Sequence, residues 1–181
     1  MSRPSSRAIR LVVAFSLSLA LPRAAPAITR TEQVGTDLIF ALPAVALGKV
    51  AAEKDLRGFL ELVESYAVCG AATGVLKLTV HERRPNGGQH SFPSGHASSS
   101  FTAAEFLRER FGWEWGIPAY VAASYVGYSR VAAHKHHSWD AFAGAGVGIG
   151  SACIFTHPFH GAKIAVSGDS GGIAFRLTRT F

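Results

Sequence analysis

Five apolar segments, separated by short polar stretches, follow one another along most of this chain. They cover residues 36–50, 59–80, 93–107, 115–133 and 139–155. Most are about 15 to 20 residues long, which is near the lower limit for a helix that crosses a bilayer. The pattern predicts an all-α fold, a helical bundle of about five mostly membrane-spanning helices.

Basic residues near the ends of the first and third segments indicate which side of the membrane these connections lie on. Lys49, Lys54 and Arg57 follow the first segment, and Arg108 and Arg110 follow the third. Basic residues collect in the cytoplasmic connections of membrane proteins. We therefore expect these two connections to lie inside, and the connections after the second and fourth segments to lie outside.

Composition agrees with a membrane protein and argues against a nucleic-acid-binding protein. Charged residues make up 17% of the chain, whereas a soluble domain has about 25%. The alternative is a soluble bundle with unusually apolar helices. Most of the net charge of +6 comes from four arginines before residue 28, and the rest of the chain carries only +2. This small excess gives no reason to expect nucleic acid as a partner.

Residues 1–27 are typical of a secretory signal peptide. An arginine-containing start is followed by the apolar run "LVVAFSLSLALP" and by the small residues Ala25 and Ala27, which fit a cleavage site. The apolar run is about 12 residues, too short to cross a bilayer as an ordinary helix. We expect a cleaved signal, with an uncleaved anchor, and therefore six helices, as the alternative. In both cases the chain is exported.

The pattern changes after residue 160. A glycine-rich turn precedes Ile173, Phe175 and Leu177, which alternate with Ala174, Arg176 and Thr178. Alternation with a period of two predicts a short β-hairpin. The expected organisation is a signal peptide at 1–27, a helical domain at 28–160 and a C-terminal tail at 161–181.

Three polar clusters lie where the outer connections are expected. They are "KLTVHERRP" at 77–85, "PSGH" at 93–96 and "SRVAAHKHHSWD" at 129–140. A phosphoryl group needs fixed positive charges and N–H donors around its oxygens. Lys77, Arg84 and Arg130 can supply the charges, and "PSGH", with Pro93 at a plausible helix start, can supply the donors. The clusters therefore predict a phosphate site.

The third cluster also contains a candidate nucleophile. His136 and Asp140 are four residues apart and share a face if the segment is helical. An aspartate that accepts from one ring nitrogen fixes the tautomer and leaves the other nitrogen free to attack. His96, in a separate cluster, can protonate the leaving alkoxide. His134 and His137 lack the i,i+4 partner, and we expect them to be solvated or satisfied nearby.

The run "HKHH" at 134–137 allows a second interpretation, since clustered histidines suit zinc. No group of Cys, Asp or Glu completes a closed zinc shell, except Asp140, which already has a partner in the nucleophile interpretation. A metal site is therefore not expected.

The three clusters resemble the tripartite signature of the type-2 phosphatidic acid phosphatase superfamily. That superfamily includes lipid phosphate phosphatases, bacterial class A acid phosphatases and vanadium haloperoxidases. Its signature reads K-x6-R-P, then P-S-G-H, then S-R-x5-H-x3-D, and this chain fills every position at the right spacing. The resemblance covers about a third of the chain. It implies a helical bundle, no required metal or cofactor, and these roles: His136 as nucleophile, Asp140 as its orienting partner, His96 as acid, and Lys77, Arg84, Ser94, Gly95 and Arg130 as phosphate-binding residues.

The expected function is an exported membrane phosphatase that hydrolyses a lipid phosphate or diphosphate monoester through a phosphohistidine. Phospholipids, isoprenyl diphosphates and lipid A-type phosphates are the candidate substrates. The expected location is the bacterial cell envelope, in the inner membrane with the site facing the periplasm. A soluble periplasmic acid phosphatase is the alternative. A haloperoxidase has little room in the seven residues between Pro85 and Pro93, and a transporter or lipid-binding scaffold does not require this chemistry.

Overall fold

The computed structural model describes residues 29–159, 162–169 and 172–179, so the expected signal peptide at 1–27 lies outside the described residues. Helices and two strands make up the regular structure of this part. The helices are α1 (Arg30–Ala52), α2 (Leu56–Thr79), α3 (Gly95–Phe111), α4 (Trp113–Ala132) and α5 (Ser138–Phe155). The prediction of a helical bundle is confirmed.

Side-chain caps mark the starts of α1, α2 and α3, and a glycine separates α3 from α4. Thr29 caps α1 by accepting from the N–H of Glu32 at 3.2 Å, so α1 starts at Arg30, six residues earlier than the apolar pattern predicts. Ser94 caps α3 in the same way, which places the helix start inside the "PSGH" motif. Gly112, at φ 90°, separates α3 from α4 in a backbone conformation that favours glycine.

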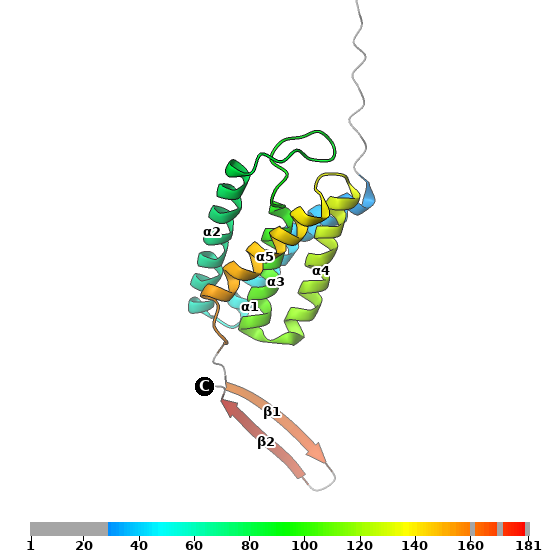
Figure 1. The fold of residues 1–181 in the computed structure, drawn as a ribbon. Helices are drawn as coiled ribbons and strands as arrows, with labels where there is room; N and C mark the ends of the chain where they lie inside the picture. Colours follow the sequence, from blue (N-terminus) through cyan, green and yellow to red (C-terminus); the bar gives the residue numbers. More distant parts are fainter. Residues whose placement is uncertain (1–28, 160–161, 170–171, 180–181) are drawn as a thin grey trace, which may run out of the picture.

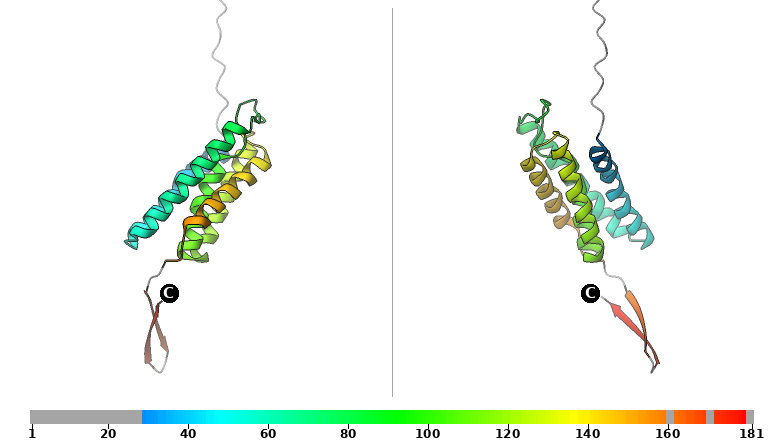
Figure 2. Two further views of the ribbon diagram at one scale, coloured as in Figure 1. Left: turned by 60° about the vertical axis from the view of Figure 1, so that its left-hand side comes forward. Right: turned by 90° about the vertical axis from the view of Figure 1, so that its right-hand side faces the viewer.

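Helix α3 lies at the centre of the bundle and contacts all four other helices (Figures 1 and 2). Its contact with α5 is close because α5 presents glycines. A Cβ on Gly148 would lie 2.3 Å from the carbonyl oxygen of Ser98, so only glycine fits there. The small residues of α5 thus permit close helix packing. The apolar core around α3 includes Leu42, Leu62, Ala103, Phe106 and Leu107.

The two longer connections lie at one end of the bundle, which we call the loop end. The α2–α3 connection and the α4–α5 connection are both there, together with the start of α1 (Figure 1). The α1–α2 turn, the α3–α4 turn and residues 156–159 lie at the opposite end. Helices α1, α3 and α5 therefore begin at the loop end, and α2 and α4 end there.

The exterior of the bundle is apolar. Nineteen large apolar side chains of the described residues are exposed, among them Phe40, Leu78, Val121 and Phe142. α1 and α2 are long and apolar enough to cross a membrane. Only 22% and 28% of their apolar windows are buried, so these helices are not ordinary core helices of a soluble protein. The apolar surface suits a lipid environment.

A buried ionic network ties the elements together at the end opposite the loop end. Arg110 of α3 donates to Asp55 at 2.6 and 2.7 Å and to Glu61 of α2 at 2.9 Å. It also donates to the carbonyl oxygen of His157 at 2.7 Å, after the end of α5. Arg110 is therefore a buried partner of two carboxylates, although the sequence pattern suggests only an inside-facing charge.

Residues of the C-terminal tail form two antiparallel strands, β1 (Ala162–Asp169) and β2 (Gly172–Arg179). Their register runs from the pair Ala162 and Arg179 to the pair Asp169 and Gly172.

Candidate active site

The three polar clusters of the sequence meet at the loop end. Backbone hydrogen bonds join two of them directly, because the N–H of Ser94 donates to the carbonyl oxygen of Asp140 at 2.9 Å. The first cluster is adjacent, since a Cβ on Gly95 would lie 3.9 Å from Cε of Lys77. Segments more than fifty residues apart thus contribute to a single site, as the phosphate-site prediction requires.

His136 and Asp140 lie across the α4–α5 connection and the first turn of α5. The Nδ1 atom of His136 is 3.5 Å from Oδ2 of Asp140, slightly longer than a hydrogen bond. Both side chains are buried, His136 at 4% exposure and Asp140 at 0%. Asp140 Oδ2 is fixed in place by the hydroxyl of Ser91 at 2.5 Å and by the N–H of His137 at 2.8 Å.

The surroundings of His136 keep its ring neutral. Burial, together with the positive charges of Arg84 and Lys77, lowers the pKa of His136 to about 4, whereas Asp140 acts in the opposite direction. A neutral imidazole retains a lone pair on one ring nitrogen. His136 is thus in the protonation state that a nucleophile needs.

The start of α3 offers backbone donors to an anion. Ser94 is the N-cap, and Gly95 and His96 occupy the first turn of the helix. The first N–H groups of a helix have no partner inside it, and the positive end of the helix dipole lies there. Lys77, at the end of α2, donates to the carbonyl oxygen of His90 at 3.0 Å and lies beside this helix start. These features together form an arrangement suited to an anion such as phosphate, which we call the phosphate cradle.

Arg130 is more strongly engaged inside the protein than the sequence indicates. Its Nη2 donates to the carbonyl oxygen of Glu32 at 2.6 Å and to Oγ1 of Thr36 at 3.3 Å. The carboxylate of Glu32 lies 4.0 Å from Arg130 and 3.5 Å from Lys135. The first turns of α1 therefore hold Arg130, and a side chain on Gly35 would collide with Ser129.

Glu32 is a residue of the site that sequence reasoning misses. It lies 98 residues before Arg130 in the chain and belongs to no motif. The only signal is that the polar turn "TRTEQ" precedes an otherwise apolar helix. That signal marks the start of a helix, but it does not indicate which other residues lie beside it.

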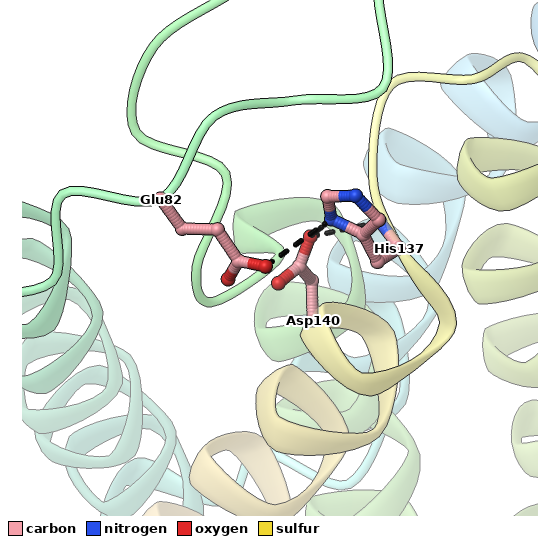
Figure 3. Close-up of side chains that lie close together, drawn as sticks. All are labelled: Glu82, His137 and Asp140. Carbon is pink, nitrogen blue, oxygen red and sulfur yellow. Dashed lines mark hydrogen bonds and ion pairs between the residues drawn. The ribbon is translucent and has the colours of Figure 1, made fainter.

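Glu82, His137 and Asp140 form a second cluster beside the nucleophile candidate (Figure 3). Nδ1 of His137 lies 3.3 Å from Oε1 of Glu82 and 3.4 Å from Oδ2 of Asp140. Trp139 stacks on the His137 ring at 4.5 Å and donates to Glu82 at 2.8 Å. His137 thus has acidic neighbours although it lacks an i,i+4 partner in the sequence. His134 is exposed, as expected.

The centre of this second cluster needs either a proton or a metal cation. Three acceptor atoms converge there if the Nδ1 atom of His137 carries no proton. A proton on Nδ1 would satisfy both carboxylates, and a divalent cation could occupy the same place. The hydroxyl of Ser91 and the N–H of His137 already donate to Asp140 Oδ2, which leaves this oxygen a weak metal ligand. A proton on Nδ1 of His137 therefore explains this geometry better than a bound metal ion does.

Comparison with known proteins gives relatives of one kind. A model of the PAP2 superfamily matches residues 58–163. A lipid A 4'-phosphatase of Helicobacter pylori is 31% identical over 69% of this chain and 69% of its own length. A lipid A 1-phosphatase of Porphyromonas gingivalis is 32% identical over 46% of this chain, and the match covers only 20% of that protein.

Two solved structures have a similar fold. The crystal structure of Aquifex aeolicus LpxE aligns with a TM-score of 0.58 and 21% identity, over 68% of this chain and 83% of its own. A transmembrane PAP2-type phosphatidylglycerolphosphate phosphatase from Bacillus subtilis aligns with a TM-score of 0.55 and 24% identity, over 69% of this chain and 71% of its own. The relatives support phosphoric monoester hydrolase activity, as the sequence predicts. The family match covers more than half of the chain, so the chain belongs to the PAP2 superfamily.

Proposed function

We propose that this protein is a membrane phosphatase that removes a phosphate monoester from a lipid A-type phosphoglycolipid. The observation that carries the proposal is the meeting of a buried histidine, its aspartate and the nearby cations Arg84 and Lys77 at one end of an apolar bundle. Such a site can bind and attack phosphate, and an apolar exterior brings it to a lipid.

The substrate class follows from the two phosphatase relatives. Both are named for lipid A, one for its 1-phosphate and one for its 4'-phosphate. The two positions carry the same chemical group on a sugar, so the residues of the phosphate cradle suit either. We therefore propose the class of substrate without choosing a position on the sugar.

The proposed reaction has two steps. Lys77, Arg84, Arg130, the hydroxyl group of Ser94 and the N–H group of Gly95 hold the phosphoryl oxygens. The free ring nitrogen of His136 then attacks phosphorus. A nitrogen–phosphorus bond forms, the ester oxygen–phosphorus bond breaks, and the lipid alkoxide leaves.

Proton transfer completes the cycle. His96, which takes up a proton when the negatively charged phosphate binds beside it, donates this proton to the leaving alkoxide in the first step. It then accepts a proton from water, which attacks the phosphohistidine, breaks the nitrogen–phosphorus bond and releases inorganic phosphate. Asp140 acts as a positioning residue, because it fixes the ring of His136 and stabilises its positive charge during attack.

We propose that the loop end faces the periplasm from the inner membrane. Lys49, Lys54 and Arg57 lie at the opposite end, as the positive-inside rule requires of a cytoplasmic face. Cysteine labelling of intact cells, in a background without Cys69 and Cys153, should modify position 90 and leave position 54 unlabelled. Labelling at position 54 would refute this orientation.

Phosphate release by the purified protein in detergent tests the function. The substrates are bisphosphorylated lipid A, phosphatidic acid, phosphatidylglycerol phosphate, an isoprenyl diphosphate and the soluble p-nitrophenyl phosphate, with His136→Ala as control. The highest kcat/KM is expected for lipid A. Release from none of them would refute a phosphatase. Activity confined to the soluble ester, with the protein in the soluble fraction, would favour a periplasmic acid phosphatase.

A further inference from the structure

A groove runs along the outside of the bundle between α2 and α3. Its volume is about 240 Å³, and its lining starts at Lys77 and Gly95, which both belong to the proposed phosphate cradle. From there it passes Gly74 and Gly70 and ends at Tyr66. The groove is therefore continuous with the site and leads away from it along the side of the bundle.

The length of the groove compares with the thickness of a membrane leaflet. Tyr66 and Lys77 are eleven residues apart on α2, which corresponds to about 16 Å along a helix axis. The hydrocarbon core of a bilayer is about 30 Å thick. A chain that enters beside Lys77 and follows the groove would reach approximately the middle of the bilayer.

Glycines on α2 leave the groove open. A Cβ on Gly70 or on Gly74 would meet no atom within 4 Å, so nothing in the bundle fills the space beside them. The two glycines are four residues apart and lie on the same face of the helix. The opening thus results from a particular pair of small residues, and a larger side chain at either position would occupy it.

Three of the four hydroxyl groups that line the groove donate hydrogen bonds inside the protein. Thr73 donates to Oγ of Ser98 at 3.1 Å, and Ser98 donates to the carbonyl oxygen of Ser94 at 2.9 Å. Tyr66 donates to the carbonyl oxygen of Ser99 at 3.0 Å. An apolar molecule can therefore lie against these three side chains without depriving them of a hydrogen-bond partner.

From these observations we infer that the groove holds one acyl chain of the substrate while the phosphate lies at Lys77 and Gly95. This inference rests on the proposed lipid phosphatase function and extends it to the lipid part of the substrate. The acyl chain moves from the apolar interior of the bilayer into an apolar groove, so the groove adds little binding affinity. Its effect is to orient the lipid so that the phosphate meets His136, which is a contribution to the rate.

A second copy of the protein is the competing occupant. Gly70 and Gly74 form a Gly-x-x-x-Gly pattern, which in apolar helices often mediates helix association. An acyl chain accounts better for the groove, because its outer end contains a lysine of the phosphate cradle. That cation suits an anionic headgroup with a chain attached, whereas a helix of a second copy has no need of it.

The test compares two substrates that differ only in their chains. Bisphosphorylated lipid A and its fully deacylated glucosamine disaccharide bisphosphate have the same sugars and phosphates. Wild-type protein is expected to show at least a tenfold higher kcat/KM for the acylated form. Gly70→Leu and Gly74→Leu should each lower this kcat/KM about tenfold or more and leave that for the deacylated form unchanged. Val75→Phe, on the same helix but outside the groove lining, is the matched control and should change neither.

Each other outcome has a definite meaning. Unchanged hydrolysis of lipid A by both leucine variants would show that the chain lies elsewhere. An equal loss on both substrates would mean that the variants disturb the phosphate cradle, and this would also overturn the inference. A change from dimer to monomer on crosslinking, without a change in acyl preference, would assign the groove to a second copy. Hydrolysis of neither substrate by wild-type protein would instead count against the proposed function.

Discussion

Asp140→Asn is the most informative single substitution, because it removes charge and keeps shape. Oδ2 of Asp140 accepts from Ser91 and from the N–H of His137, whereas Oδ1 is buried without a partner. The oxygen of an asparagine can take the place of Oδ2 and keep both hydrogen bonds. Its amide group then occupies the position without partners, so the variant is expected to fold.

The expected loss in kcat can be derived from what remains. The carbonyl oxygen of asparagine still faces Nδ1 of His136, but the negative charge that stabilises the ring during attack is gone. In the serine protease triad the equivalent Asp→Asn change costs about 10⁴ in kcat. The separation of 3.5 Å between His136 and Asp140 is longer than a hydrogen bond, so we expect a loss of about 10³ to 10⁴. This corresponds to roughly 4 to 5.5 kcal/mol of barrier.

Rapid quenching with radiolabelled phosphate ester is the assay. The quench must be alkaline, because phosphohistidine is labile in acid, and the label is mapped to a residue. His136→Ala should remove both the label and nearly all turnover, and Asp140→Asn should slow labelling and turnover together. His134→Ala should change kcat by less than about tenfold. Label on His134 or His137, or full activity in His136→Ala, would refute the assignment.

Three further predictions concern pH, metal and stability. Because the pKa of His136 is about 4 in the folded protein and about 6.5 when unfolded, the folded state takes up fewer protons as pH falls through this range. His136 should therefore contribute a loss of about 2 kcal/mol of stability between pH 7 and pH 5, and His136→Gln should reduce the loss seen in thermal unfolding by about this amount. Activity should survive EDTA and be inhibited by vanadate, whereas a loss restored by zinc and absent in Glu82→Gln would indicate a metal at Glu82 and His137. Arg110→Leu leaves two buried carboxylates without a partner and should cost about 3 to 5 kcal/mol in the free energy of unfolding, measured by denaturation in detergent.

The helices could be predicted because their outward-facing side chains are apolar, and this is visible in the sequence. Apolar side chains such as Phe40 and Val121 face outward, so most of the helices stand out as apolar segments. The interior contains polar residues, including Glu105 and Arg110, that pair only with particular partners. Which carboxylate meets Arg110 depends on packing between segments, and the pattern along the chain carries no such information.

In the candidate site, too, some residues could be predicted from the sequence and others could not. His136, Asp140 and His96 are apparent from sequence because spacing within a motif reflects local geometry. Glu32 and Glu82 are not, because each meets its partners only after distant helix ends converge. A motif therefore identifies the groups proposed to contact phosphate, and the structure adds the groups that hold them.

The charge balance of the loop end links binding to reactivity. Three helices begin there and two end there, so the helix dipoles leave a net positive potential at that end. Lys77 and Arg84 add full positive charges. This potential attracts phosphate, and the same cations help to lower the pKa of His136. A site without them would bind phosphate weakly and would also leave more of the histidine protonated, with no lone pair for attack. The groups proposed to recognise the substrate thus also keep the proposed nucleophile ready, and loss of Lys77 should impair both binding and the chemical step.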